Sequence, residues 1–380
     1  MLPLTSALFE LIVLRLLAQK YVQYISPDQH GFMSKRSTTT NLTCFTSFVI
    51  RQLENGQQVD AIYTDLSAAF DKMNYQIAIA KFDKLGMNDN LLVWLESYLT
   101  GKNMSIKIGV HISSPFPVWP GVPQGSHLGP FLFLLYMNDV ILTLKCSKLS
   151  YADDLKLYYT IKQPKDALFL QQQLEAFADW CQLNRMSLNV SKCSVISFSR
   201  RSSNINFNYA FAGLQLKRES TVKDLGILLD TKLNFKDHVA YIVSKASSQL
   251  GFLFRFAKKF KNIYCLKALY CAIVRPLLEY ASVVWAPYNQ DGKNRVEAVQ
   301  RRFVRFALRH LRWANPRHLP CYESRCLLFR LELLEDRRNL AKACFIADLL
   351  QGNIDCSSLL SSLNINIRRR NFRSHPFLRI

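Results

Sequence analysis

The segment Lys148-Leu-Ser-Tyr-Ala-Asp-Asp-Leu-Lys-Leu-Tyr-Tyr159 sets two adjacent aspartates between two runs of apolar and aromatic residues. Both runs are short and partly alternating, so they predict two β-strands joined by a turn at Asp153 and Asp154. An Asp-Asp pair in a hairpin is usually only a turn. Here the apolar flanks indicate that the two acids cap a hairpin whose strands are buried.

The segments around this hairpin predict a β-α-β-β-α-β order of elements. Strands are expected at 59–64, within 148–159 and at 193–199, and the intervening helices at 67–85, 131–144 and 165–184. Further helices are expected at 4–24, 37–54 and 89–100, a hairpin at 104–118, and a mostly helical chain beyond about 213. This order is typical of antiparallel strands backed by helices on one face, so the predicted fold class is α+β.

A third carboxylate, Asp65, comes directly after the strand expected at 59–64. Alone, such an aspartate is usually a turn residue or a helix cap. Phosphoryl transfer to a sugar hydroxyl, however, gains from two hard cations about 3.5–4 Å apart, and Mg²⁺ takes oxygen ligands. Carboxylates at the ends of adjacent strands meet that need, because a rigid sheet fixes their separation. Asp65, Asp153 and Asp154 are therefore candidate metal ligands.

The charge of the chain is strongly positive and unevenly distributed. Its 380 residues carry 49 Lys and Arg against 28 Asp and Glu, a net charge of +21. Residues 1–200 hold 18 basic and 15 acidic residues, a net of +3, whereas residues 201–380 hold 31 and 13, a net of +18. A half this basic is typical of a protein that binds a polyanion such as nucleic acid. A solubility surface and an acidic protein partner are the alternatives.

Cysteine spacing argues against a disulfide-stabilised protein, and hydropathy argues against a secreted or membrane-spanning one. The ten cysteines lack paired spacing, which favours free thiols in a reducing compartment over a disulfide framework. Two apolar stretches, Met1–Gln19 and Leu128–Leu144, are interrupted by charged or polar residues. We expect both to be buried helices rather than a signal peptide or a membrane span.

Three blocks of sequence resemble the catalytic motifs of reverse transcriptases, specifically those of jockey-like non-LTR retrotransposons. Asp65–Asp71 is similar to the first motif, Gly121–Pro130 to the second and Tyr151–Asp154 to the third. The resemblance covers nearly the whole chain and continues through Gln29–Phe32, Arg36–Thr38, Leu188–Cys193, Lys223–Gly226, Val274–Tyr280 and Glu297–Phe303. A set of motifs in a fixed order identifies a family with far greater specificity than any single motif does.

The resemblance implies a right-hand polymerase fold. Its palm would be a split β-α-β antiparallel sheet backed by helices, with partial fingers before it and a helical basic thumb after it. Residues 1–58 would be the partial fingers and 59–212 the palm. Residues 213–380 would hold the primer grip, the thumb and the basic helical C-terminal region.

The resemblance also implies an activity, RNA-directed DNA polymerisation by two-metal phosphoryl transfer from a dNTP to a primer 3'-hydroxyl. The cofactor would be two Mg²⁺ ions, with Mn²⁺ as a substitute, and the partners an RNA template, a DNA primer and dNTPs, without a membrane. The alternative is a catalytically inactive remnant that only binds nucleic acid. An RNA-dependent RNA polymerase is disfavoured by Phe70 and by the Tyr-Ala ahead of the two aspartates.

For the reaction itself, the resemblance assigns four residues. Asp65 and Asp153 would bind both metals, and Asp154 would complete the site. Lys192 matches a lysine that protonates the departing pyrophosphate. As an isolated residue, it would most often be a solvated side chain.

For the incoming nucleotide, the resemblance assigns four more residues. Phe70 would lie under the sugar, where its ring clashes with a 2'-hydroxyl, although a core position on its helix is the alternative. Gln124 would contact the nucleotide from a loop in which glycines such as Gly125 let the backbone approach the ligand. Arg36 would reach the triphosphate from the fingers.

For nucleic acid, the resemblance makes Lys223–Gly226 the element that grips the primer, with Leu225 and Gly226 at its centre. Independently of any family, Arg301, Arg305 and Arg309 recur at helical spacing on a row separate from the apolar residues of their segment. This row predicts a track for phosphates, and a merely solvated face is the alternative.

The chain also departs from the family pattern. It begins late in the fingers, no endonuclease domain precedes it and no Cys-His knuckle follows, which is expected of a fragment of a longer polyprotein or of a decayed copy. An intracellular location is expected, and nuclear action fits a retroelement enzyme. Arg368–Arg370 is too short to count as a targeting signal.

Overall fold

The computed structural model describes residues 4–101, 103–117, 121–123, 125–201, 203–257, 262–310 and 320–363. The chain divides into two compact units. Unit 1 comprises Met1–Ser37 and Phe48–Ser220, and unit 2 comprises Thr38–Ser47 and Thr221–Ile380. The helix α2, Thr38–Glu54, contributes residues to both.

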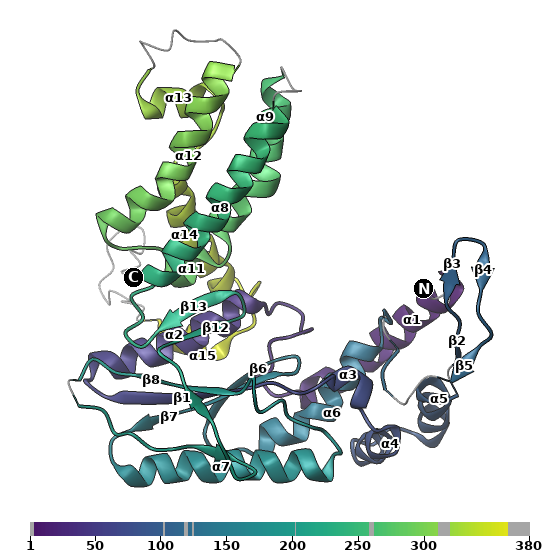
Figure 1. Ribbon diagram of the computed structural model, residues 1–380. Helices are drawn as coiled ribbons and strands as arrows, with labels where there is room; N and C mark the ends of the chain where they lie inside the picture. The colour runs from purple at the N-terminus through teal and green to yellow at the C-terminus, as the bar shows by residue number, and fades with distance from the viewer. Residues whose placement is uncertain are drawn as a thin grey trace, which may run out of the picture. The chain divides into compact units, whose positions relative to one another are not determined.

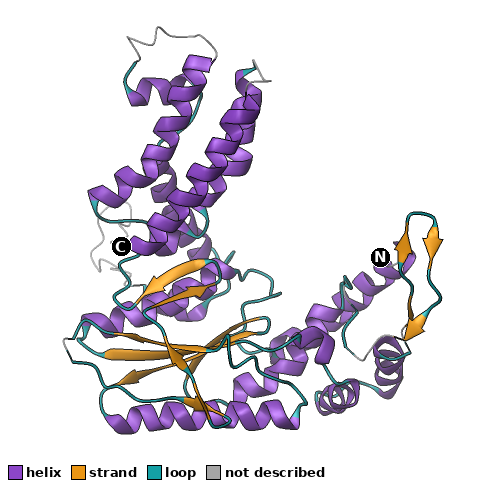
Figure 2. Cartoon of the chain, viewed as in Figure 1, coloured by secondary structure: helices purple, strands orange, loops and turns teal. Residues whose placement is uncertain are grey.

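Unit 1 is built on a five-stranded mixed sheet, whose strands are orange in Figure 2. The strand order is β11-β8-β1-β7-β6. The bounds are β1 Gln58–Thr64, β6 Ser147–Tyr151, β7 Asp154–Ile161, β8 Ser194–Phe198 and β11 Lys217–Arg218. β1 runs antiparallel to β7 and β8, β6 antiparallel to β7, and β11 parallel to β8. The predicted α+β class and the β-α-β-β-α-β order are confirmed.

The helices of unit 1 bury one of the two apolar segments that the sequence marks. The expectation of a buried helix at Met1–Gln19 is wrong, because only Glu10, Leu17 and Tyr21 of the first helix are buried, whereas Leu4, Leu8 and Ile12 are exposed. The helices of unit 1 are α1 Leu4–Tyr21 with a 3-10 turn at Val22–Tyr24, α3 Ala69–Lys72, α4 Tyr75–Lys84, α5 Asp89–Leu99, α6 Gly129–Thr143 and α7 Pro164–Leu183. Figure 1 shows α7 running along one face of the sheet. In α6 almost every residue from Phe131 to Ile141 is buried, so its uniform hydropathy reflects a core position. None of the described helices is both long enough and apolar enough to cross a membrane.

Short two-stranded ladders complete unit 1. β2 Asn103–Met104 pairs with β5 Phe116–Pro117, β3 Lys107–Ile108 with β4 His111–Ile112, and β9 Ala210–Phe211 with β10 Leu214–Gln215. The hairpin expected at 104–118 is therefore present as two short ladders.

One expected helix is wrong in detail, whereas the mostly helical chain expected beyond about 213 is confirmed from α8 Lys236–Ala257 onward. The single helix expected at 67–85 is two helices, because the Asn74 side chain accepts a hydrogen bond from the Ile77 amide (3.1 Å) and starts α4 anew. Ala68, just before α3, adopts the left-handed conformation at φ 51°. Before α8, β12 Thr221–Asp224 and β13 Ile227–Asp230 form a hairpin.

Unit 2 is otherwise helical. Its elements after the hairpin are α8 Lys236–Ala257, α9 Ile263–Leu269, a π-helical turn at Tyr270–Val274, α10 Arg275–Glu279, α11 Ser282–Trp285, α12 Gln290–His310, α13 Tyr322–Leu328, α14 Leu334–Leu350 and α15 Ser357–Ser362. α8 and α12 pack side by side (Figure 1). The apolar row that the sequence predicts in α12 comprises Val296, Val299, Phe303 and Phe306. The first three are buried, and Phe306 is half-buried and stacks on Phe254 (3.9 Å between ring centroids).

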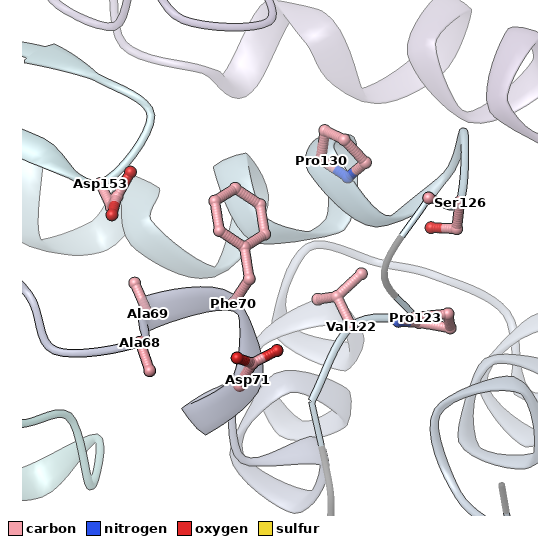
Figure 3. Close-up of a pocket in the computed structure, with 10 residues that line it drawn as sticks. Ala68, Ala69, Phe70, Asp71, Val122, Pro123, Ser126, Pro130 and Asp153 are labelled. Carbon is pink, nitrogen blue, oxygen red and sulfur yellow. The ribbon is translucent and has the colours of Figure 1, made fainter. Parts of the chain in front are cut away.

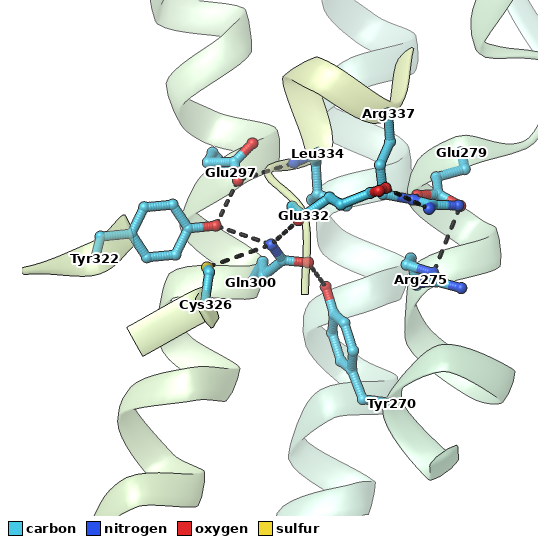
Figure 4. Close-up of polar contacts among 10 residues, drawn as sticks. All are labelled: Tyr270, Arg275, Glu279, Glu297, Gln300, Tyr322, Cys326, Glu332, Leu334 and Arg337. Atoms are coloured by element: carbon cyan, nitrogen blue, oxygen red, sulfur yellow. Dashed lines mark hydrogen bonds and ion pairs between the residues drawn. The ribbon is translucent and has the colours of Figure 1, made fainter. Parts of the chain in front are cut away.

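A buried polar network fixes α12 against its neighbours in unit 2 (Figure 4). The fully buried Gln300 accepts a hydrogen bond from the Tyr270 hydroxyl (3.0 Å) and donates to the Glu332 carbonyl (2.8 Å). Glu297 accepts from the Tyr322 hydroxyl and from the Leu334 amide (3.1 Å). Buried polar groups are tolerated when they are paired in this way, so the network sets the rotation of α12.

Candidate active site

The end of β1 and the turn between β6 and β7 bring Asp65 and Asp153 to one edge of the sheet. Thr64, the last residue of β1, lies opposite Leu155 of β7. Asp65 follows Thr64 directly, and Asp153 belongs to the two-residue turn that closes the β6–β7 hairpin, where Tyr151 pairs with Asp154. The acidic turn predicted from the sequence is therefore confirmed as a structural element.

The electrostatics of this edge favour a cation. The pKa of Asp153 is raised, first because the carboxyl is partly buried and then because the charge of Asp65 lies nearby. A carboxylate disfavoured by burial and by a second carboxylate gains from a bound metal ion. The donor atoms are carboxylate oxygens, the ligands that Mg²⁺ prefers. Asp154 is more exposed, at the first position of β7.

Lys192 lies beside this pair. Its Nζ atom is 3.5 Å from Oδ2 of Asp65. The backbone explains the approach, since the Asn189 amide donates to the Asp65 carbonyl (2.8 Å) and the Lys192 amide to the Asn189 carbonyl (2.9 Å). A tight turn after α7 thus holds the lysine at the end of β1.

A cavity of about 410 Å³ opens next to the acidic edge. Its lining comprises Ala68, Ala69, Phe70, Asp71, Val122, Pro123, Gly125, Ser126, Pro130 and Asp153. In Figure 3 the Phe70 ring stands between Asp153 on one side and the segment of Val122 and Pro123 on the other. The cavity therefore connects the first, second and third motifs of the sequence.

Phe70 both lines this cavity and packs in the core. Its ring stacks on that of Phe133, with centroids 4.3 Å apart and planes 25° apart. Phe32 meets it edge-on at 6.1 Å. The two interpretations offered by the sequence, a wall of the nucleotide site and a core residue, are thus compatible.

The glycine-rich loop is held against α3 by its backbone. The Val122 amide donates to the Phe70 carbonyl (2.9 Å). A Cβ atom at Gly121 would lie 2.5 Å from the Asp71 carbonyl oxygen, so only glycine permits this approach. Gly125 lines the cavity with φ 81°, and Gln124 lies outside the described residues.

The Arg36 guanidinium is bound to backbone carbonyls of its own segment. Its Nη1 atom donates to three backbone carbonyls, those of Ser26 (3.2 Å), Pro27 (3.2 Å) and Gln29 (2.8 Å). Arg36 does not contribute to the described lining of the 410 Å³ cavity. A contact between its guanidinium and a triphosphate remains a prediction.

The sequence did not reveal the role of Gln29 in this site. The Gln29 side chain contacts the backbone of Ala152, the residue before Asp153. Gln29–Phe32 stood out only as part of the family resemblance, and nothing in its composition indicates which element it touches.

A second cavity, of about 340 Å³, lies in unit 2 around the β12–β13 hairpin. It is lined by Lys223, Gly226, His238, Tyr241, Ile242, Lys245, Pro276, Leu277 and Tyr280. The hairpin turn contains Leu225 and Gly226, at φ 42° and 93°, and the Tyr280 hydroxyl donates to the Leu225 carbonyl (2.9 Å). Tyr280 therefore fixes the turn in which two of the predicted nucleic-acid contacts lie.

The rim of the second cavity is cationic. The pKa of the Tyr241 hydroxyl is lowered, mainly by a hydrogen bond with Lys245 and further by the charge of Lys223. Both lysines are exposed. Exposed ammonium groups beside a hydroxyl suit a phosphate oxygen.

The arginine row of α12 is not uniform. Arg305 and Arg309 are exposed. The Arg301 guanidinium lies 5.0 Å from the centre of the Tyr322 ring, and its Nε atom is buried without a partner among the described residues. Arg305 and Arg309 are thus the exposed members of the row, whereas Arg301 is partly engaged in packing.

Comparison with known proteins identifies relatives in sequence. The chain is 28% identical over 295 residues to the "Probable RNA-directed DNA polymerase from transposon BS" of Drosophila melanogaster, covering 74% of this chain and 32% of that protein. It is 26% identical over 318 residues to the "RNA-directed DNA polymerase from mobile element jockey" of the same species, covering 80% and 34%. The chain therefore spans about a third of the length of these curated relatives.

A solved telomerase structure from Candida albicans, in complex with a fragment of telomeric RNA, aligns with 83% of this chain and 58% of its own, at 11% identity and a TM-score of 0.44. The family described as "Reverse transcriptase (RNA-dependent DNA polymerase)" matches residues 6–229, more than half of the chain. None of the ten cysteines, all of which lie within the described residues, forms a disulfide, and the Sγ atoms of Cys44 and Cys356 lie 3.0 Å apart. By the extent of the family match, this protein belongs to the reverse transcriptase (RNA-dependent DNA polymerase) family.

Proposed function

We propose that this chain is the RNA-directed DNA polymerase portion of a non-LTR retrotransposon and extends a DNA primer on an RNA template. The observation that carries the proposal is the meeting of Asp65, Asp153 and Lys192 at one edge of the sheet, beside a cavity walled by Phe70. Family membership supports the same chemistry, since reverse transcriptases act with divalent metal ions.

Asp65 and Asp153 hold the metal ions in this account, and Asp154 completes the ligand set. Two Mg²⁺ ions, or Mn²⁺ as a substitute, would lower the barrier by neutralising charge on the attacking and leaving oxygens. The carboxylates fix the place of those ions because they project from adjacent strands of a rigid sheet. The raised pKa of Asp153 indicates that the metal-free carboxylate pair is electrostatically unfavourable.

Lys192 supplies the proton for the departing pyrophosphate. Its ammonium carries three N–H donors and lies 3.5 Å from Asp65. A general acid acts within hydrogen-bonding reach of the group that it protonates. In the resting protein, Asp65 keeps this ammonium at the edge of the site.

Phe70 selects the sugar. Its ring is held by stacking on Phe133 (4.3 Å between centroids), so it is a stiff wall rather than a mobile side chain. A stiff wall under the ribose position excludes a 2'-hydroxyl by overlap. Gln124 and Gly125 would contact the nucleotide from the facing loop, and Arg36 would reach the triphosphate after leaving its present carbonyl partners.

Unit 2 supplies contacts to nucleic acid. Leu225 and Gly226, fixed by Tyr280, would grip the primer, and the lysines of the 340 Å³ cavity would add phosphate contacts. Arg305 and Arg309 would track phosphates along α12, with Arg301 at the start of the row. In the right-hand description, residues 1–58 are partial fingers, 59–212 the palm, and 213–380 the primer grip, thumb and basic C-terminal region.

Primer extension tests the proposal. Purified wild-type protein with Mg²⁺ and dNTPs should extend a DNA primer on an RNA template, and Asp153→Ala should not. Asp89→Ala, which removes an exposed aspartate at the start of α5, is the matched control and should extend as wild type does. Wild-type protein that binds primer–template without extending it would instead support the inactive remnant.

A further inference from the structure

One buried side chain, that of Gln29, hydrogen-bonds to both backbone polar groups of Ala152, whose carbonyl also accepts from the Ser150 hydroxyl (3.0 Å). The Ala152 amide donates to Gln29 Oε1 (3.1 Å), and Gln29 Nε2 donates to the Ala152 carbonyl (3.3 Å). Oε1 also accepts from the Gly31 amide (2.9 Å), and Nε2 also donates to the Ser150 hydroxyl (3.1 Å). Gln29 is 0% exposed, so water does not compete for these bonds.

The backbone on both sides of Gln29 also hydrogen-bonds to Ser150, which precedes the same turn. The Ser150 amide donates to the Asp28 carbonyl and the His30 amide to the Ser150 carbonyl, both at 2.9 Å. A Cβ atom at Gly31 would lie 2.3 Å from the Ala152 nitrogen, so a glycine is required there. Residues 28–31 thus form a backbone clamp on the β6–β7 turn.

The clamp acts where the turn is least favourable. Ala152 has φ 59°, a left-handed conformation that residues other than glycine rarely adopt. A non-glycine residue persists in such a conformation when its surroundings over-determine it. Ala152 directly precedes Asp153, so its backbone conformation sets the direction in which the Asp153 side chain leaves the turn.

We infer that Gln29 is a positioning residue for catalysis: it fixes the Tyr151–Asp154 turn and thereby the direction of the Asp153 carboxylate toward the metal site. This inference rests on the proposed function, since it assigns Asp153 to that site. Among the described residues, the Gln29 side chain makes no hydrogen bond to the cavity lining or to the carboxylates. Its effect is transmitted through the Ala152 backbone.

Gln58 provides a matched control. It is also a buried glutamine of unit 1, 1% exposed, and makes three hydrogen bonds: to Asp60 (2.8 Å), to the Ile205 carbonyl (2.9 Å) and from the Ile205 amide (2.9 Å). It lies at the start of β1, so six residues of strand, or roughly 20 Å, separate it from the end of that strand. Gln→Met at either position removes the same chemical group at similar size.

The first test compares Gln29→Met, Gln58→Met and wild type in two assays. Gln29→Met should reduce kcat by about 100-fold, the scale expected when a catalytic group is misplaced by about 1 Å, with little change in KM for dNTP or primer–template. Its affinity for Mn²⁺, measured by electron paramagnetic resonance without nucleic acid or dNTP, should weaken by about 10–100-fold. Gln58→Met should retain the wild-type kcat and Mn²⁺ affinity even at an equal loss of Tm.

A second variant tests the hydrogen bonds themselves. Gln29→Glu keeps an acceptor for the Ala152 amide but sets a second acceptor against the Ala152 carbonyl. Only the protonated carboxyl can donate there, and burial raises the pKa of a carboxyl. The kcat of Gln29→Glu relative to wild type should therefore rise as the pH falls, whereas that of Gln58→Met should not change.

The outcomes separate the inference from the proposed function. Wild-type kcat and Mn²⁺ affinity in folded Gln29→Met would overturn the inference, as would equal losses in both Met variants. If Gln29→Met does not fold, a flat pH profile of Gln29→Glu relative to wild type overturns it. A wild-type chain that binds Mn²⁺ but extends no primer contradicts the proposed function, and the Mn²⁺ comparison still decides the role of Gln29. A wild-type chain that neither binds Mn²⁺ nor extends a primer contradicts both the inference about Gln29 and the proposed function.

Discussion

The ammonium group of Lys192 lies 3.5 Å from a carboxylate oxygen of Asp65, although 127 positions separate the two residues in the chain. The isolated bridge between Leu66 and Leu188 brings their segments together. A cation and a carboxylate that we propose as a metal ligand thus share the same edge of the sheet. Two roles are open to such a lysine, neutralising Asp65 or donating a proton, and substitution separates them.

Lys192→Arg should be nearly as slow as Lys192→Ala. Arginine keeps the positive charge beside Asp65, but its guanidinium is not deprotonated in proteins and so cannot act as a general acid. Both variants should lose about 10²–10⁴-fold in the rate of nucleotide incorporation, the usual contribution of a general acid. Rapid-quench measurement of single incorporations checks this. Restoration of the rate by arginine would show that charge alone matters.

Phe70→Ala should relax discrimination against ribonucleotides. Removal of the ring opens space where a 2'-hydroxyl would otherwise overlap it, and we expect the ratio of kcat/KM for dNTP over rNTP to fall by at least about tenfold. The ratio is insensitive to a general loss of stability, which the broken stack on Phe133 also causes. Phe169→Ala is the control, because that ring packs on Tyr159 outside the cavity (4.8 Å). An unchanged ratio for Phe70→Ala would leave Phe70 as a core residue only.

The sequence predicted the frame of the site because its elements are strongly patterned. The acidic turn, the strand before Asp65 and the apolar helix 131–144 each have a local signal that tertiary packing does not override. The break between α3 and α4 escaped prediction because Asn74 caps the second helix within an otherwise helical run. At a position such as Asn74, the side chain competes with the helix backbone for hydrogen bonds to backbone amides. The pattern of apolar residues does not show this competition.

Arg305→Ala combined with Arg309→Ala should reduce the salt dependence of primer–template binding. Each lost phosphate contact lowers the magnitude of d log K/d log[salt] by about 0.7–0.9, so the pair should lose roughly 1.5 units, and the triple variant with Arg301→Ala roughly two. Arg301→Ala should also lower Tm, since Arg301 packs on Tyr322. Lys162→Ala combined with Lys165→Ala, at two exposed lysines of unit 1, is the charge-matched control for the double variant. An unaltered slope in the double variant would make the row a solvated face.

His238 should make unit 2 sensitive to acid. The side chain is 1% exposed, and burial lowers its pKa from its usual value near 6.5 to about 4. As the pH falls from about 6.5, the unfolded chain binds a proton that the folded protein does not bind until about pH 4. The free energy of unfolding should therefore decrease across this window, by about 3 kcal/mol from this residue.

His238→Phe isolates that contribution. Phenylalanine can still pack against Trp285, which His238 meets edge-on at 5.2 Å, but it does not titrate. Urea unfolding of wild type and variant at about pH 7 and about pH 4 gives the difference that belongs to His238. An equal acid-induced loss of stability in both proteins would contradict the assignment.

His238 and Gln29 show what the sequence could not supply. Each is a polar residue whose role depends on contacts with distant segments: His238 Nδ1 accepts from the Leu228 amide (3.3 Å), and Gln29 binds the Ala152 backbone. Patterns of hydropathy identify which residues are buried but not which partners satisfy a buried polar group. These partners became visible only in three dimensions.

The most direct test of the account is single-nucleotide incorporation by Asp153→Asn, with primer–template affinity and Tm measured on the same protein. The substitution removes a proposed metal ligand but keeps the shape of the side chain. Because burial and Asp65 already disfavour the charge of Asp153, the variant should have a Tm no lower than that of the metal-free wild type near neutral pH. The account predicts that incorporation is abolished while primer–template affinity is unchanged or slightly higher. Incorporation within about tenfold of wild type, about 1.4 kcal/mol in the barrier, would contradict the metal site at Asp65 and Asp153.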